Sequence, residues 1–157
     1  MAKEIERKFL INKNLWQAPE KGLKIRQGYL SSAKERVVRV RTKGTKSFIT
    51  VKGVTKGISR SEFEYEIPNE DAELMLDNLC EKPLVEKTRY LIDYKGHTWE
   101  IDEFFGANDG LIVAECELQD ADERMEKPDW CGVEVSGDPR YFNSNLIAHP
   151  YSEWKEE

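Results

Sequence analysis

Charged residues two positions apart recur along most of this chain, each pair set against apolar neighbours. In Lys3–Ile11, the side chains of Glu4, Glu6 and Lys8 would project from one face of a strand, because successive residues of an extended chain point to opposite sides. Carboxylate clusters suit Mg²⁺ or Mn²⁺, whereas Lys and Arg are the usual partners of phosphate oxygens. The same layout returns as Arg39/Arg41, Thr50/Lys52, Glu62/Glu64, Lys87/Arg89, Glu100/Asp102 and Glu115/Glu117. The repetition predicts one enclosed site for a polyphosphate and its metal ions.

Eight segments have the alternation and composition of β-strands and are joined mostly by short turns. They are residues 3–11, 24–30, 35–42, 47–52, 59–67, 85–93, 98–104 and 111–118. Strands that follow one another through short links pair antiparallel. One helix is expected from about Asn69 to Cys80 and a second from its N-cap Asp138 to before Pro150, while residues 121–131 are expected to form an acidic loop. The sequence has no Gly-rich phosphate loop and no alternation of strands with helices, which disfavours a doubly wound or P-loop nucleotide fold.

The charged faces have two interpretations. In the plainer one, an open sheet packs its apolar face on helices and turns its charges to water. However, the sign of charge is nearly uniform within a strand and differs between strands, and like charges opposite one another destabilise a sheet unless a ligand or ions compensate them. Two helices are also too few to cover the apolar faces of so many strands, whereas a barrel of about eight strands encloses side chains or one small ligand. We therefore predict a mainly β (α+β) fold, a closed eight-stranded antiparallel barrel with a few flanking helices, in a single domain over residues 1–157.

Composition excludes several classes of protein. The 24 basic and 30 acidic residues give a net charge of -6, which argues against a nucleic-acid binder that relies on overall positive charge. No stretch has the length of a transmembrane helix, and the N-terminal residues lead into a strand rather than a signal peptide, so no membrane partner is expected. Cys80, Cys116 and Cys131 form no C-x-x-C pair, which indicates reduced thiols and a cytoplasmic location. The oligomeric state stays open, with a homodimer as one option.

Together these motifs resemble the CYTH superfamily, the triphosphate tunnel metalloenzymes, whose hallmark is an N-terminal E-x-E-x-K. The similarity covers nearly the whole chain in order, through Glu4-Ile5-Glu6-Arg7-Lys8, Arg39-Val40-Arg41, Thr50-Val51-Lys52, Glu62-Phe63-Glu64, Lys87-Thr88-Arg89-Tyr90, Trp99-Glu100-Ile101-Asp102, Glu115-Cys116-Glu117 and Arg140-Tyr141-Phe142-Asn143. The resemblance implies an eight-stranded antiparallel tunnel and metal-dependent hydrolysis of triphosphates. Small bacterial members are typically inorganic triphosphatases, while others act on thiamine triphosphate or nucleoside triphosphates, or make cyclic AMP. The chain departs from many relatives at Val133, where they carry Lys.

Residue type, alternation and this resemblance give each charged pair an expected role. The first choices for metal ligands are Glu4, Glu6, Glu115 and Glu117; the acids that would complete the metal shell, orient water or pair with the bases are Glu62, Glu64, Glu100 and Asp102. Phosphate oxygens would be held by Lys8, Arg39, Arg41, Lys52, Lys87 and Arg89, whereas solvated positions are expected for Lys24, Arg26 and Arg60. Lys87 could also be the catalytic base, since Arg89 and other cations would lower its pKa and Tyr29 could hydrogen-bond to it. Bound phosphates would raise that pKa again, so phosphate binding is its preferred role.

The function predicted from the sequence is that of a divalent-metal-dependent triphosphatase acting on inorganic triphosphate, with nucleoside triphosphates as additional substrates, by in-line attack of water on the terminal phosphorus. Two enzymatic alternatives stay open, an adenylate cyclase and a thiamine triphosphatase. A further alternative is a non-catalytic polyphosphate-binding module, which would keep the basic strips and tolerate loss of the carboxylates. Both sets of charges are present, which favours catalysis. The expected cofactor is Mg²⁺ or Mn²⁺, and the expected partner is a small-molecule triphosphate.

Overall fold

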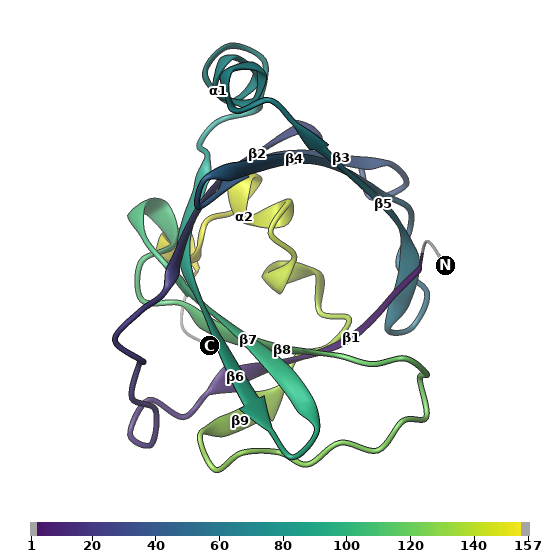
Figure 1. Cartoon of the computed structure of the whole chain (residues 1–157), viewed down its shortest axis with the longest axis vertical. Coiled ribbons are helices and arrows are strands. Elements are labelled where there is room, and N and C mark those ends of the chain that lie inside the picture. The colour runs from purple at the N-terminus through teal and green to yellow at the C-terminus, as the bar shows by residue number, and fades with distance from the viewer. Residues whose placement is uncertain (1–2, 155–157) are drawn as a thin grey trace.

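The computed structural model describes residues 3–154, whose strands form one antiparallel sheet that curls into a closed barrel (Figure 1). The strand order is β5-β4-β3-β2-β6-β7-β8-β1-β9, and the additional pairing of β5 with β1 closes the ring. The strands are β1 (Lys3–Ile11), β2 (Leu23–Ser31), β3 (Val37–Lys43), β4 (Lys46–Lys52), β5 (Ser59–Ile67), β6 (Val85–Tyr94), β7 (His97–Phe104), β8 (Ile112–Glu117) and β9 (Cys131–Glu134). The predicted eight-stranded closed barrel is confirmed, while the single domain over residues 1–157 stays a prediction, because residues 1–2 and 155–157 lie outside the described part.

A ninth strand, β9, was not predicted. It pairs with β1 at Phe9 and Ile11, whereas β5 pairs with β1 at Lys3, Glu4 and Ile5. The long first strand therefore carries β5 along one part of its length and β9 along another. Four residues are too few for the alternation of polar and apolar side chains to indicate a strand.

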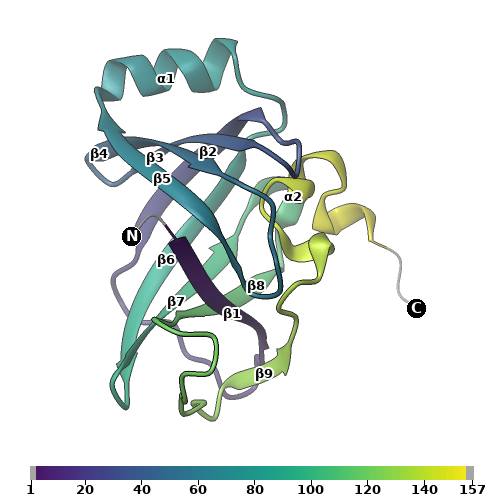
Figure 2. The ribbon, with the colours of Figure 1, turned by 90° about the vertical axis from the view of Figure 1, so that its right-hand side faces the viewer.

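Helices are few and lie outside the sheet or at its end. The predicted first helix is confirmed as α1 (Asn69–Asn78), which packs Ala72 and Leu76 against Val40 on the outer surface of the barrel (Figure 2). No helix within residues 3–154 is long and apolar enough to cross a membrane.

The second predicted helix is wrong as one continuous element. The chain instead forms the 3-10 helix η2 (Pro139–Tyr141), the short helix α2 (Asn145–Ala148) and the 3-10 helix η3 (Tyr151–Glu153). Asp138 caps η2 as expected, by accepting a hydrogen bond from the backbone N–H of Arg140. Phe142 is extended, with φ -69° and ψ 129°, because the residues around it bond to the barrel wall, and such tertiary contacts outweigh helix propensity.

We call residues 136–148 the C-terminal segment, and it covers one end of the barrel (Figure 2). Leu146 and Ile147 of α2 are buried in one hydrophobic cluster with Val85 and Val113 from the strands. A second cluster, around Phe9, Trp99 and Trp130, packs against the other face of the same sheet. The apolar residues thus cover the outside and one end of the barrel, which leaves its interior to the charged side chains.

Candidate functional site: a charged cavity inside the barrel

A cavity of about 220 Å³ lies within the barrel, and all eight barrel strands together with the C-terminal segment contribute to its lining. The charged lining residues are Glu4, Glu6, Lys8, Arg39, Arg41, Lys43, Lys52, Arg60, Glu62, Glu64, Lys87, Arg89, Glu100, Glu115 and Glu117. Every residue predicted to hold phosphate is among them, and so is every predicted metal ligand except Asp102. The charged faces of the strands therefore point inward, as predicted from their alternation.

The acidic part of the wall runs across three neighbouring strands. Glu6 on β1 lies opposite Glu117 on β8, and Glu115 on β8 lies opposite Glu100 on β7. Burial raises the pKa of Glu6 well above its usual value, and the charges of Glu115 and Glu4 raise it further. Burial and the charges of Glu4 and Glu100 likewise raise the pKa of Glu117. Like charges this close destabilise a sheet unless a cation compensates them.

The basic part of the wall is densest along β3, where Arg39, Arg41 and Lys43 share one face. Burial lowers the pKa of Arg41 to about 10, and the charges of Arg39 and Arg89 contribute to that shift. Within residues 3–154, the buried Nε atoms of Arg39 and Arg41 have no hydrogen-bond partner. Unpaired buried donors cost free energy, so this wall has N–H groups that an anion would satisfy.

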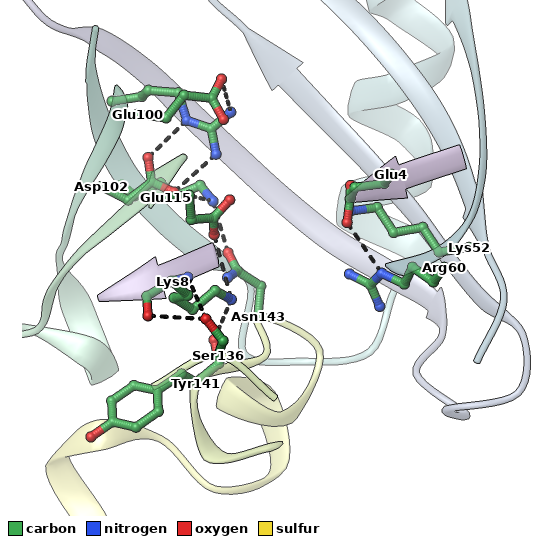
Figure 3. A network of polar contacts seen from close by, with 12 residues as sticks. Glu4, Lys8, Lys52, Arg60, Glu100, Asp102, Glu115, Ser136, Tyr141 and Asn143 are labelled. Carbon is green, nitrogen blue, oxygen red and sulfur yellow. Dashed lines mark hydrogen bonds and ion pairs between the residues drawn. The ribbon is translucent and has the colours of Figure 1, made fainter. Parts of the chain in front are cut away.

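Acid–base pairs join the neighbouring strands β4, β5 and β1 along one side of the cavity (Figure 3). The Nζ atom of Lys52 lies 2.9 Å from Glu4 Oε2 and 3.2 Å from Glu62 Oε2, and Arg60 Nε lies 3.3 Å from Glu4 Oε1. Although burial alone would raise it, the pKa of Glu4 is held far below its usual value by the hydrogen bond to Glu62 and by the charges of Lys52 and Arg60. Burial and the hydrogen bond with Glu4 raise the pKa of Glu62 to about 7. Of the two carboxyl groups, Glu62 therefore takes up a proton at the higher pH.

A second network is centred on Asp102, on the other side of the barrel (Figure 3). Its carboxylate accepts bonds from Arg89 Nε at 2.8 Å and Arg89 Nη2 at 2.9 Å, and Oδ2 lies 2.8 Å from Lys87 Nζ. Asp102 is 2% exposed and does not line the cavity. Because both of its oxygens are held by cations behind the cavity wall, the geometry does not favour the predicted metal role and favours one in positioning Lys87 and Arg89.

The prediction of a hydrogen bond between Tyr29 and Lys87 is wrong, since within residues 3–154 each of the two side chains bonds to other partners. Lys87 lies opposite Ile25 on β2, four positions from Tyr29, and its Nζ donates to Asn143 Oδ1 at 2.8 Å. The Tyr29 hydroxyl accepts from Gln27 Nε2 at 3.2 Å instead. The predicted lowering of the Lys87 pKa is present: burial, more than the charge of Arg89, lowers it to about 7 against the opposing charge of Asp102.

Sequence reasoning missed several lining residues. Arg60 was expected in solvent, but it pairs with Glu4 and its side chain is only 18% exposed. Its alternation with Glu62 and Glu64 was a signal for an inward position, and so was that of Lys43 with Arg41. Lys24 is exposed and Arg26 bonds to Glu73 of α1 on the outer surface, as expected for solvated positions. The C-terminal segment also contributes Phe142, Asn143 and Ser144 to the lining. Phe142 and Asn143 belong to the last motif of the family resemblance, but sequence reasoning assigned them no role in the site.

The acidic wall fits a divalent cation in part. Within the described residues no three carboxylate, thiol or imidazole groups converge on a ready-made metal site. Several cavity acids are instead paired with Lys or Arg, as Glu115 is with Lys8 at 3.4 Å. Glu6 and Glu117, however, form no ion pair with any described residue, and they lie opposite each other. Mg²⁺ is commonly held by one or two carboxylates together with substrate phosphates, so this pair is a sufficient donor set.

Comparison with known proteins identifies the family. The CYTH domain family matches residues 2–151, so the chain belongs to the CYTH domain family. The inorganic triphosphatase of Acetivibrio thermocellus is 51% identical over 156 residues, covering 99% of this chain and 100% of that protein. The inorganic triphosphatase of Nitrosomonas europaea is 39% identical over 153 residues, covering 91% of this chain and 95% of that protein.

Solved structures share the fold. The crystal structure of the inorganic triphosphatase NE1496 superimposes with a TM-score of 0.65 at 33% identity, covering 91% of this chain and 96% of that one. A putative adenylate cyclase from Bacillus halodurans superimposes with a TM-score of 0.60 at 16% identity, covering 77% of this chain and 84% of that one. At that identity the second likeness concerns the fold alone.

Proposed function

We propose that this chain is a divalent-metal-dependent triphosphatase that hydrolyses inorganic triphosphate inside the barrel. The observation that carries the proposal is the pair of buried Nε–H groups of Arg39 and Arg41, which have no partner among residues 3–154 and lie on a wall that faces clustered carboxylates. Buried donors without a partner call for an anion, and the neighbouring acids call for a cation. A metal–triphosphate complex supplies both charges. The names of the two relatives, both inorganic triphosphatases, support the same substrate.

Phosphate oxygens would be bound by the cations of the basic wall, which are Lys8, Arg39, Arg41, Lys52, Lys87 and Arg89. Several of these cations are paired with acids in the free protein, for example Arg39 and Arg41 with Glu64 Oε2, each at 3.5 Å. A triphosphate would replace those carboxylates as the partner of the guanidinium groups. In the transition state the charge is spread over the equatorial oxygens of the terminal phosphoryl group, and the fixed cations stabilise it.

The metal would be held by Glu6 and Glu117, with Glu4, Glu62, Glu64 and Glu115 as further oxygen donors once phosphate takes their Lys and Arg partners. Bound there, Mg²⁺ or Mn²⁺ would neutralise phosphate charge and make the attacking water more acidic. This coupling explains why the described part of the free protein has acids in the cavity but no ready-made metal site. Each phosphate contact that a cation makes releases a carboxylate for the metal.

Lys87 is proposed as a phosphate ligand, with general-base catalysis as its second candidate role. Because its pKa lies at about 7, part of the Lys87 population is neutral in the free protein at neutral pH. A bound phosphate raises the pKa of a neighbouring amine, which favours the charged, phosphate-binding form. Tyr29 lines the cavity, where burial raises its pKa and its hydroxyl accepts a hydrogen bond from Gln27 Nε2, and its part in catalysis stays a prediction.

A comparison of three triphosphate substrates tests the proposal. The protein is incubated with tripolyphosphate, ATP or thiamine triphosphate, with Mg²⁺ or Mn²⁺, and phosphate, pyrophosphate and cyclic AMP are measured. Phosphate from tripolyphosphate supports the proposal, and the amounts released from ATP and thiamine triphosphate rank those substrates. Cyclic AMP with pyrophosphate from ATP would instead support an adenylate cyclase, and tight binding without turnover would support a polyphosphate-binding module.

The three thiols, free in the structure, fit the proposed cytoplasmic location, and the homodimer stays a prediction.

A further inference from the structure

Asn143 enters the cavity from the C-terminal segment and not from a strand (Figure 3). Its side-chain oxygen accepts two hydrogen bonds, from Lys87 Nζ at 2.8 Å and from Gln27 Nε2 at 2.8 Å. A lysine ammonium group can only donate, so the oxygen of the Asn143 carboxamide must face Lys87. Gln27 is fully buried in β2 and holds the same oxygen from the other side. Asn143 is therefore fixed in orientation by two elements that are far apart in the sequence.

The bonds of Lys87 leave a defined donor for a ligand. An ammonium group has three N–H donors, and Lys87 directs one to Asp102 Oδ2 and one to Asn143 Oδ1, both at 2.8 Å. The side chain is 2% exposed and still lines the cavity. Two acceptors thus hold Nζ at the wall, with the centroid of the Phe104 ring 5.4 Å away. Among the described residues the third N–H has no oxygen acceptor, so an oxygen bound in the cavity could take it.

The acceptor from the C-terminal segment is neutral, and the charge on the wall explains why that matters. The Asp102 carboxylate already serves both Lys87 and Arg89. A second carboxylate at position 143 would add a negative charge where an anion has to bind. The same segment offers another neutral acceptor, the backbone carbonyl of Tyr141, which lies 3.2 Å from Lys8 Nζ. The segment therefore seats two lysines of the basic wall without reducing their positive charge.

We propose that Asn143 is a positioning residue for triphosphate binding, which holds the ammonium group of Lys87 toward the cavity through an uncharged oxygen. This inference rests on the proposed function in one respect, namely that the cavity takes a triphosphate. The competing explanation is that Asn143 only fastens the C-terminal segment to the barrel. The two explanations differ in what a substitution changes, because fastening affects stability and positioning affects the affinity for the anion.

The test compares Asn143→Ala and Asn143→Asp with the matched control Asn145→Ala. Asn145 is the same residue type two positions along, and its side chain donates within the segment, to the carbonyl of Pro139 at 2.7 Å. For each protein, the Kd for tripolyphosphate is measured by calorimetry in EDTA, kcat and KM are measured with Mg²⁺, and the thermal midpoint is recorded. The calorimetric Kd does not depend on turnover.

We expect Asn143→Ala to raise Kd and KM about tenfold, the effect of losing one hydrogen bond to a charged group, with a smaller change in kcat. Asn143→Asp keeps the shape and the acceptor but adds a charge, so Kd should rise more, by about 100-fold, and the excess over Asn143→Ala should shrink at high salt. Asn145→Ala should leave Kd and KM near the wild-type values. In a Lys87→Ala background, Asn143→Ala should have little further effect on Kd, since the two residues act as a unit.

Several results would overturn the proposal. They are an unchanged Kd in Asn143→Ala with a lowered thermal midpoint, equal Kd values for the Ala and Asp variants, or an undiminished effect in the Lys87→Ala background. If Asn143→Ala does not fold, the shape-matched Asn143→Asp variant provides the test, and a wild-type Kd for that variant would refute the proposal. Wild-type protein that binds tripolyphosphate without hydrolysing it would refute the proposed function and leave the test of Asn143 readable. Wild-type protein that does not bind tripolyphosphate would refute both.

Discussion

Glu6 on β1 lies directly opposite Glu117 on β8, with both carboxylates lining the interior of the barrel. Neither carboxylate forms an ion pair with a described residue, although the cavity is rich in Lys and Arg. Burial and neighbouring acids raise the pKa of both groups. Such a pair is unfavourable in the free protein, and it therefore marks the position where a cation is needed.

The first prediction concerns Glu6→Gln, which should abolish turnover of tripolyphosphate. The same substitution should leave the thermal midpoint at pH 8 in EDTA unchanged or raise it. The sign follows from the raised pKa of Glu6: its contribution to stability is present below the unfolded-state pKa and is lost as pH rises through the folded-state pKa, and Gln removes that loss. Phosphate release and a pH series of melting curves check both parts.

The matched control for Glu6 is Glu103→Gln. Glu103 lies on β7 next to Asp102 but does not line the cavity. We expect activity and melting behaviour close to those of the wild type. Unchanged turnover in Glu6→Gln would contradict the metal role. If Glu6→Gln and Glu103→Gln lost turnover to the same extent, the cause would be a general effect of removing an acid.

The second prediction concerns the basic wall. Arg39→Ala should raise KM for tripolyphosphate by about tenfold to 100-fold with a smaller effect on kcat, because charge-assisted hydrogen bonds contribute about 1.5–3 kcal/mol each. Arg26→Ala, which removes an outer-surface arginine bonded to Glu73, should leave KM unchanged. Steady-state kinetics on both variants decide the matter, and an equal rise in KM for the two would show that only the overall charge of the protein matters.

The third prediction separates the two roles considered for Asp102. Asp102→Asn leaves Lys87 and Arg89 as buried cations without their anionic partner, and breaking a buried ion pair in this way costs about 3–5 kcal/mol of unfolding free energy. Urea denaturation measures the loss. Asp93→Asn, at an exposed position on β6, should change the unfolding free energy by about 0.5 kcal/mol or less.

A different outcome for Asp102→Asn would support the metal role that its sequence motif predicted. In that case the variant would keep its stability, and the concentration of Mg²⁺ needed for half-maximal activity would rise.

The fourth prediction concerns the thiols. Burial raises the pKa of Cys116 and of Cys131 to about 11, whereas an unperturbed thiol titrates near 8.5. The thiolate is the reactive form, so labelling of the native protein by a disulfide reagent at pH 8 should be much slower than labelling of the unfolded chain. The rate should increase as pH rises toward 11, first at the half-buried Cys131, and Cys131→Ser identifies its share. Fast labelling of native protein at pH 7 would be inconsistent with these environments.

The barrel and most of the cavity lining could be predicted from the sequence, because alternation in a strand fixes which side chains share a face. Arg39, Lys52 and Glu115 were placed correctly on that basis alone. Alternation does not, however, separate a side chain that reaches the cavity from one held behind its wall. Asp102 shares the face of Glu100, yet Arg89 and Lys87 hold it out of the cavity.

What could not be predicted depends on contacts between segments far apart in the chain. The alternation of Arg60 with Glu62 and Glu64 indicates its face, but its ion pair with Glu4 on β1 depends on the closure of the barrel. The interruption of the last helix follows from contacts of Tyr141 and Asn143 with Lys8 and Lys87. No local propensity encodes these tertiary contacts, which is why Phe142 and Asn143, although part of a matched motif, were given no role in the site.

The central claim is that this charged cavity binds and cleaves an inorganic triphosphate with the help of a divalent metal. The most direct test follows tripolyphosphate by phosphorus NMR in the presence of the protein and Mg²⁺ or Mn²⁺. We predict that orthophosphate and pyrophosphate appear in equal amounts at first, that EDTA stops the reaction, and that the Glu6→Gln protein leaves the substrate intact. Tripolyphosphate that persists unchanged with wild-type protein and either metal would contradict the claim.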